Sequence, residues 1–453
     1  MSSGFSTSFL GRLVQIQTAA LVLVFAGILV SGYHGQTWSE VQSFQVVDNW
    51  CEVGSQGIGN HCFGDFGLPY FRGLGANPYT ENNFAAANTP LTAVIFEVLR
   101  LFPYNFALLV YLISMIAALS VPFFSRKSRL SGGERIQLAV LSSLITCGGI
   151  VAFDRGNHVA FFVPLLVGFL LSVQREKWRQ AVILMTLMAM LKFWGILFVV
   201  VLIARSKWLH AVTSIFLAGI LSAVLLIPFP GSFASSVKAM ISMAGNRDYA
   251  NAVSGYSISL HGFLRRTSCA VSSPNWCDTK AHGDSIWASP VVSIAIAIGL
   301  SLAVYFLVRN PKVPDLIWIT SAVSLGFLAV PEAPMYNLVL LAAIPAVIAC
   351  LPEYSADPNW RLSTGAVMAA LVVSQTPFTL FSTTASRFAS GTSDSVVVFR
   401  SAYWITPSLW VTFLLLVLID YLRGGTLYDK QNRESKRNGK LPRNRDVKVE
   451  EFS

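Results

Sequence analysis

The chain has 453 residues, of which 54% are hydrophobic and only 12% are charged, and its mean hydropathy is +0.57. A soluble domain carries about 25% charged residues, so these values exclude an ordinary water-soluble fold and indicate an integral membrane protein. The formal net charge is +10, but the basic residues lie in short clusters between apolar runs. This distribution is typical of cytoplasmic loops and argues against nucleic acid as a partner.

The apolar segments predict an all-α polytopic membrane protein with about 11–12 membrane helices, short half-spans included, because about 20 apolar residues are needed to cross a bilayer. The first segment, near residues 13–33, shows no clear small-residue cleavage site, so we expect a membrane helix rather than a signal peptide. A first large outer loop follows at about residues 34–103. Within it, residues 89–102 are apolar but carry Glu97 and Arg100, which favours an interfacial or half-inserted helix.

The segment Ala181–Ala204 does not fit a single span. As one span it places Arg205 and Lys207 outside, against the tendency of basic residues to remain in the cytoplasm, and leaves Lys192 in mid-membrane. Two half-spans place the basic pair inside and Lys192 at the outer turn, so we predict a hairpin of two short helices. Single spans are expected on either side of it, at residues 104–124, 137–153, 159–173 and 211–227.

A second large outer loop is expected at about residues 229–285. The later spans lie near residues 287–308, 314–330, 337–351, 364–381 and 403–422. This path gives one transmembrane domain, residues 1–422, with both termini on the cytoplasmic side of the plasma membrane. Residues 423–453 are rich in Lys and Arg, and we expect them to form a disordered basic cytoplasmic tail.

The cysteines divide between the outer loops and the apolar segments. Cys51 and Cys62 share the first loop, and Cys269 and Cys277 share the second. One disulfide within each loop would suit an oxidising outer side, although spacing alone does not decide the pairing. No loop offers a compact set of four metal ligands, so no metal site is expected.

One loop carboxylate stands out as a candidate catalytic group. Asp65 lies in the run Gly64-Asp65-Phe66-Gly67-Leu68-Pro69-Tyr70, soon after the first helix, and Asp48 is its main competitor. A lone loop Asp is usually solvated or caps a helix. Further polar side chains, however, are expected near the outer side of the membrane: Arg155, Asn157, His158, Lys192, His261, Arg265, Arg266, Glu332 and Tyr336.

These polar side chains have two readings. Each alone is explained as a snorkelling or interfacial side chain. Because ionisable groups near a membrane are costly, several of them on one side indicate a functional cavity. Together they would supply one base and several groups able to hold an anion.

The order of short motifs resembles a known superfamily. Gly-Asp-Phe and Asn-Pro-Tyr in the first outer loop are followed by Thr-Pro-Leu at 89–91, Gly156-Asn157, Leu191-Lys192 and a Pro-x-x-Pro-x-Tyr turn at 331–336. Over residues 13–422 this order is similar to that of the C superfamily (GT-C) of polyprenyl-phosphate-sugar-dependent glycosyltransferases. The chain is most similar to glycosyltransferase family 87, which includes actinobacterial mannosyl- and arabinofuranosyltransferases.

The resemblance implies an inverting, metal- and cofactor-independent transfer of mannose or arabinofuranose on the extracytoplasmic face. A polyprenyl-phosphate-sugar would be the donor and a glycolipid or polysaccharide hydroxyl the acceptor. Asp65 matches the first-loop acidic position, with Asp48 as second choice for the base, and the other polar side chains would bind the donor. The late turn reads Glu332-Ala333-Pro334-Met335, where many relatives carry a Ser/His-rich stretch.

Two other classes of protein share some of these features. A transporter or flippase of lipid-linked glycans would also have many apolar helices, but such proteins usually show internal repeats and polar residues near the midplane. Here the polar residues gather at the outer ends, which favours the enzyme. A non-catalytic accessory subunit, with the loops as docking surfaces, is the remaining alternative.

Overall fold

A computed structural model describes most of the apolar segments and part of the outer loops. The described residues are 9–33, 63, 65–67, 70, 89–125, 128, 130–229, 232–238, 257–264, 267, 290–330, 333, 335–351, 360–376, 387–388, 396–397 and 400–437. Within them the fold is helical, apart from a two-residue antiparallel ladder between β1 (Arg387–Phe388) and β2 (Val396–Val397). The predicted all-α membrane fold is confirmed.

Among the described residues, 4 helices are long and apolar enough to cross a membrane. They lie in α6 (Tyr104–Ser120) continued by η2 (Val121–Phe124), α12 (Trp208–Leu226), α15 (Pro290–Arg309) and α19 (Arg400–Arg437). Their side chains are mostly exposed in the isolated chain, as lipid-facing helices require. Of the expected 11–12 membrane segments, the described residues thus contain 4 full-length spans, and most of the others are shorter apolar helices.

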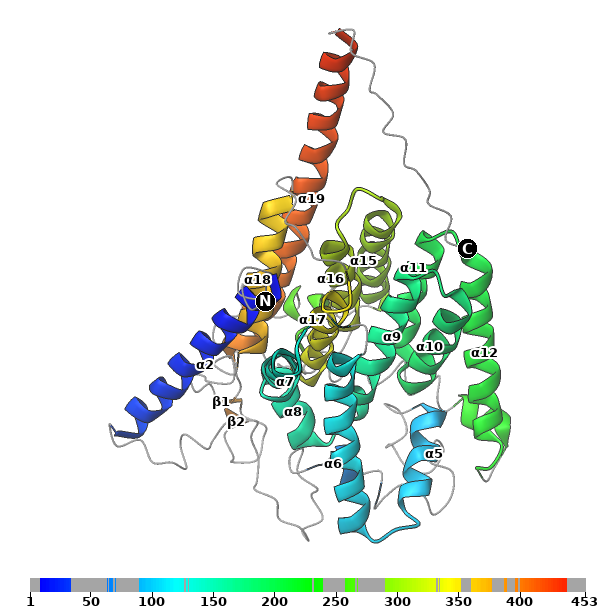
Figure 1. Cartoon of the computed structure of the whole chain (residues 1–453). Coiled ribbons are helices and arrows are strands. Elements are labelled where there is room, and N and C mark those ends of the chain that lie inside the picture. Colours follow the sequence, from blue (N-terminus) through cyan, green and yellow to red (C-terminus); the bar gives the residue numbers. More distant parts are fainter. Residues whose placement is uncertain are drawn as a thin grey trace.

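Most of the shorter helices pack inside this framework, whereas α2 (Phe9–Tyr33) extends away from it (Figure 1). Every residue of α16 (Asp315–Leu328) from Leu316 onward is buried. The helix therefore lies in the protein interior, where a helix can be apolar on all sides. The other shorter helices are α5 (Pro90–Leu99), η4 (His158–Phe161) with α9 (Phe162–Gln174), α10 (Trp178–Leu191), η5 (Phe193–Phe198) with α11 (Val199–Ala204), η7 (Met335–Ala342) with α17 (Ala343–Ile348), and α18 (Arg361–Gln375).

The span expected at residues 137–153 is bent rather than straight. It consists of α7 (Gly132–Ala139), the π-helix η3 (Val140–Leu144) and α8 (Cys147–Arg155), with a bend of 69°. Thr146 starts α8 afresh, because its hydroxyl accepts a hydrogen bond from the Gly149 amide at 3.0 Å and so caps the helix. Gly148 then lets α8 approach η7, since a Cβ there would lie 2.3 Å from the Val339 nitrogen.

The predicted hairpin at Ala181–Ala204 is confirmed. Helix α10 ends at Lys192, which is extended (φ −146°, ψ 127°), and η5 folds back against α10. Only glycine fits at position 195, because a Cβ there would lie 2.5 Å from the Met188 carbonyl oxygen. The far ends of the hairpin meet again, with Lys207 Nζ 4.8 Å from the centre of the Trp178 ring.

The basic clusters gather at one end of the bundle, the upper end in Figure 1. Contacts join the helix ends there: Gln174 donates to Asp315 at 2.9 Å, and the Arg205 guanidinium lies 5.3 Å from the Trp318 ring centre. We call this the basic end; its cations are Arg175, Lys177, Arg179, Arg205, Lys207, Arg309 and Lys312. The position of these basic clusters at one end of the bundle agrees with the predicted path of the chain.

The remaining predictions for this part of the chain have mixed outcomes. Helix α19 continues to Arg437, past residue 422, so residues 423–437 are helical rather than disordered. Cys147 is buried and Cys350 half-buried, both as free thiols, as their apolar surroundings predict. The four cysteines of the outer loops, Cys51, Cys62, Cys269 and Cys277, lie outside the described residues.

Candidate active site

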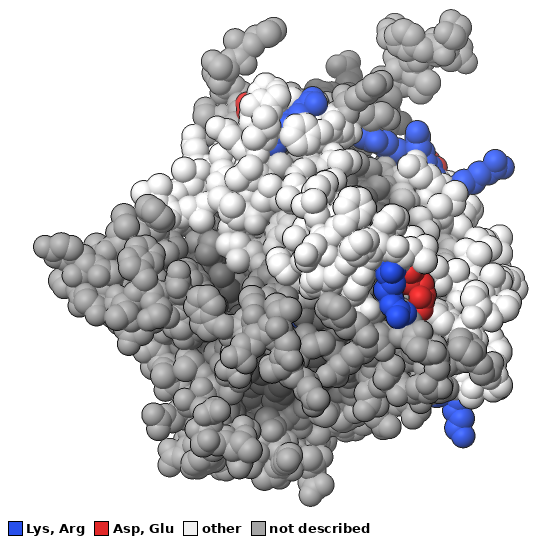
Figure 2. All heavy atoms as spheres, turned by 90° about the horizontal axis from the view of Figure 1, so that it is seen from below, with Lys and Arg blue, Asp and Glu red and all other residues white. Residues whose placement is uncertain are grey.

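The end of the bundle opposite the basic end carries the candidate site, and we call it the site end. Helices η4 and α9 together run from Asn157 at this end to Gln174 at the basic end. Helix α10 returns from Trp178 at the basic end to Lys192 at this end. Figure 2 shows this end from below. The visible described surface is mostly uncharged, apart from basic groups around its rim and one basic and one acidic group that lie side by side.

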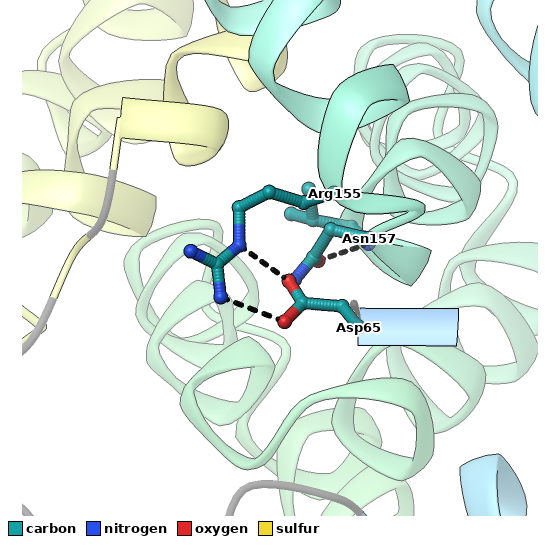
Figure 3. Close-up of polar contacts among 4 residues, drawn as sticks. Asp65, Arg155 and Asn157 are labelled. Atoms are coloured by element: carbon teal, nitrogen blue, oxygen red, sulfur yellow. Dashed lines mark hydrogen bonds and ion pairs between the residues drawn. The ribbon is translucent and has the colours of Figure 1, made fainter. Parts of the chain in front are cut away.

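Asp65 is held by two side chains of the turn after α8 (Figure 3). Arg155 donates from Nε to Oδ2 at 2.9 Å and from Nη2 to Oδ1 at 2.8 Å, and Asn157 donates from Nδ2 to Oδ2 at 2.6 Å. This is the two-pronged pairing that guanidinium and carboxylate geometry favours. The Asp65 side chain is 20% exposed, so a substrate hydroxyl can approach it.

The orientation of Asn157 follows from its second hydrogen bond. Its Oδ1 accepts from the Val159 amide at 2.9 Å, which caps η4. Because the oxygen is committed to a backbone N–H, the amide nitrogen must face Asp65. Asn157 therefore positions the carboxylate as a consequence of capping the next helix.

Gly156 lies between Arg155 and Asn157, at a position that requires a residue without a side chain. It ends α8 in the left-handed conformation, with φ 63° and ψ 39°, which glycine adopts without strain. A Cβ at this position would lie 3.0 Å from the Cβ of Phe66 and 3.4 Å from the Cα of Phe63. The turn that carries Arg155 and Asn157 thus packs directly against the segment that carries Asp65.

We expect Gly156→Ala to lower both stability and transfer activity. The left-handed conformation costs an L-residue about 1–2 kcal/mol, and the added methyl must displace the Phe63–Phe66 turn. Thermal unfolding and transfer rates in the same detergent would measure both effects. Gly219→Ala is the matched control, because α12 offers its Cβ open space; an equal loss in both variants would contradict the role of the turn.

Phe66 anchors the Asp65 segment in an aromatic pocket. Its ring is fully buried, and the ring centres of Tyr70, Phe96, Tyr104 and Tyr111 lie 4.8–5.8 Å away. Such pairs add to the stabilisation from apolar burial. The sequence showed these aromatic residues but not that they form one cluster, because they come from three separate segments.

The late turn and the second outer loop also reach this site. The Arg155 guanidinium lies 5.7 Å from the centre of the Tyr336 ring. Ala333, three residues before Tyr336, exchanges hydrogen bonds with the second loop: the Ile258 amide donates to its carbonyl at 2.8 Å, and its amide donates to Ser257 Oγ at 3.1 Å. In the same loop, His261 Nδ1 lies 3.2 Å from Ser293 Oγ of α15.

Lys192 lies at the break between α10 and η5 and is buried. The preceding carbonyl, of Leu191, accepts hydrogen bonds from Thr89 at 3.3 Å and Thr92 at 3.4 Å, so α5 fixes the position of the break. Lys192 interacts electrostatically with His158. The His158 ring is buried, and its Nε2 has no hydrogen-bond partner within the described part of the chain.

The structure thus brings several predicted residues together. Asp65, Arg155, Asn157 and Tyr336 form one contact cluster, and His158, which directly follows Asn157, interacts electrostatically with Lys192. His261 contacts Ser293 of α15. Asp48, Arg265, Arg266 and Glu332 lie outside the described residues, so their roles stay predictions.

These features define a class: a polytopic helical membrane protein with a carboxylate–guanidinium–amide site at the end opposite its basic loops. The chain belongs to glycosyltransferase family 87, whose sequence profile matches residues 87–331, more than half of its length. It is therefore a membrane glycosyltransferase, rather than a transporter or an accessory subunit. No curated protein and no solved structure matches the chain. The matched range contains Arg155, Asn157 and Lys192, whereas Asp65 and Tyr336 lie outside it.

Proposed function

We propose that the chain transfers a mannosyl or arabinofuranosyl group, with inversion, from a polyprenyl-phosphate donor to a glycolipid or glycan hydroxyl. Asp65 is the general base. The observation that carries this proposal is the fixed position of the carboxylate, held at 2.6–2.9 Å by Asn157 and Arg155 and still partly exposed.

The hydrogen bonds of Asp65 leave one acceptor position for the substrate. A carboxylate has about four lone-pair sites, two on each oxygen. Oδ2 accepts from Arg155 and from Asn157, whereas among the described residues Oδ1 accepts only from Arg155. The acceptor hydroxyl therefore binds at Oδ1, transfers its proton there and attacks the anomeric carbon. The bond from that carbon to the phosphate oxygen breaks, and its electron pair leaves with the lipid phosphate.

Lys192 is the cation that stabilises the leaving phosphate. A phosphate monoester already carries negative charge, so it needs nearby positive charge more than a proton. Arg155 is committed to Asp65, whereas Lys192 adds a further cation beside His158. Helix α10 has 14 residues and is about 21 Å long, shorter than a bilayer core of about 30 Å. Lys192 therefore meets the lipid phosphate from within the membrane.

The site faces the extracytoplasmic side. Basic residues are retained in the cytoplasm during insertion, and the candidate site lies at the end opposite the basic end. Donors linked to a lipid phosphate suit such a site, because they do not depend on cytoplasmic nucleotide sugars.

A donor comparison tests the proposal. The full chain in lipid nanodiscs is incubated with radiolabelled polyprenyl-phosphate-mannose, polyprenyl-phosphate-arabinofuranose or a nucleotide sugar, together with a membrane glycolipid extract as acceptor. We expect transfer from one of the lipid-linked donors without added metal and in the presence of EDTA. Transfer from the nucleotide sugar alone would contradict the donor assignment.

A further inference from the structure

Arg205, at the basic end, has an unmet hydrogen-bonding requirement. Its guanidinium stacks 5.3 Å from the Trp318 ring centre, and its Nε is buried without a hydrogen-bond partner among the described residues. A buried, unsatisfied N–H of a charged group is costly and calls for an acceptor.

A carboxylate on the same helix as Trp318, that of Asp315, already accepts from neutral donors. Asp315 accepts from Gln174 Nε2 at 2.9 Å through Oδ2 and from the Trp318 indole at 2.8 Å through Oδ1. No ion pair between Asp315 and Arg205 is formed in the described part of the chain. The side chains that surround Arg205 therefore hold the guanidinium in place without neutralising it.

A second cation, two positions further along the chain, also lies against a tryptophan ring. Lys207 Nζ lies 4.8 Å from the Trp178 ring centre, and the Trp178 and His210 rings are 6.4 Å apart. The three turns at residues 174–179, 204–208 and 309–315 together hold seven Lys and Arg residues, against Glu176 and Asp315 as the acidic residues of these turns. Tryptophan next to Lys and Arg is the composition found where membrane proteins meet lipid headgroups.

We propose that Arg205 and Lys207 form a binding site for the phosphate of an anionic phospholipid at the basic end, separate from the sugar-transfer site. Guanidinium forks bind phosphate oxygens with two parallel hydrogen bonds. Basic pockets between membrane helices on the cytoplasmic side are suited to anionic headgroups. The lipid tails lie along the exposed apolar residues at the start of α12, where Trp208, Leu209 and Val212 are 55–60% exposed.

Lipid titration of the full chain, followed by native mass spectrometry, tests this site. We expect the wild type to retain phosphatidylglycerol in preference to phosphatidylcholine. Arg205→Gln should weaken phosphatidylglycerol binding about ten-fold, and Arg205→Lys should weaken it nearly as much, because lysine keeps the charge but not the fork. Arg179→Gln is the matched control, since Arg179 is exposed at the same end and has no described partner. In this variant phosphatidylglycerol binding should weaken by less than about five-fold, the contribution of one surface charge.

Several results would overturn the proposal. These are equal retention of both lipids by the wild type, unchanged binding in Arg205→Lys, or an equal loss in Arg179→Gln. Displacement of the lipid by millimolar inorganic phosphate would assign the site to a soluble anion instead. Thermal unfolding identifies any variant that fails to fold, and sugar transfer in detergent should remain within two-fold (on the order of measurement error) for Arg205→Lys, because the site is not catalytic.

Discussion

Asp65→Asn is expected to reduce kcat for sugar transfer by about 10²–10⁴-fold, the usual contribution of a general base. The amide has the same shape as the carboxylate, and its oxygen can still accept from Arg155. It cannot take up the proton of the acceptor hydroxyl, however. Because the loss falls on the chemical step, KM for the donor should change much less than kcat.

The control for Asp65→Asn is a second ion pair at the site end, on the described helix α5. Glu97 and Arg100 lie 3.6 Å apart on α5, with side chains 39% and 34% exposed. Glu97→Gln should leave kcat nearly unchanged, since an exposed pair contributes only about 0–1 kcal/mol to stability. Comparing the two variants separates the loss of a base from the loss of a negative charge at that end of the molecule.

Asp48 is the alternative candidate for the general base, and the Asp48→Asn and Asp65→Asn variants decide between the two. If Asp48→Asn abolishes transfer and Asp65→Asn only lowers the thermal stability, Asp48 is the base and the Asp65–Arg155 pair is structural. If Asp65→Asn abolishes transfer while the protein unfolds at nearly the wild-type temperature, the proposed assignment stands. Substitution of Asp65 by Glu should restore little activity, because the longer side chain moves the carboxylate from the position fixed by Arg155 and Asn157.

The sequence was most informative where charge constrained the path of the chain. Arg205 and Lys207 predicted the hairpin, because a single span would have put both on the wrong side of the membrane. The isolated lysine at position 192 then had to lie at the turn, where the structure places it. Charges are sparse in this chain, so each one restricts the topology strongly.

The sequence was less informative where packing decides the outcome. The bend within residues 137–153 depends on Gly148 meeting η7, a partner nearly two hundred residues away, and hydropathy contains no trace of that contact. The pairing of Asp65 with Arg155 was also out of reach. Both were predicted as polar groups of the same face, but only the left-handed turn at Gly156 brings the guanidinium to the carboxylate.

Arg155→Lys is expected to lower kcat by about 10–100-fold, although the positive charge is kept. A lysine ammonium is a point charge and cannot donate in parallel to Oδ1 and Oδ2, so the carboxylate would be fixed only by Asn157. Misplacing a catalytic group by about 1 Å can cost about 10²-fold in rate. The contact of the guanidinium with Tyr336, 5.7 Å from the ring centre, is also lost.

Steady-state kinetics of Arg155→Lys, Arg155→Gln and Arg100→Lys would test this role. Arg100→Lys is the matched control, because it makes the same substitution in the exposed pair on α5 and should retain nearly full activity. Combining Arg155→Lys with Asp65→Asn should cost little more than Asp65→Asn alone, since Arg155 acts through the carboxylate and coupled residues are not additive. Fully multiplicative losses in the double variant would instead show that Arg155 contacts the substrate independently, and the positioning role would have to be abandoned.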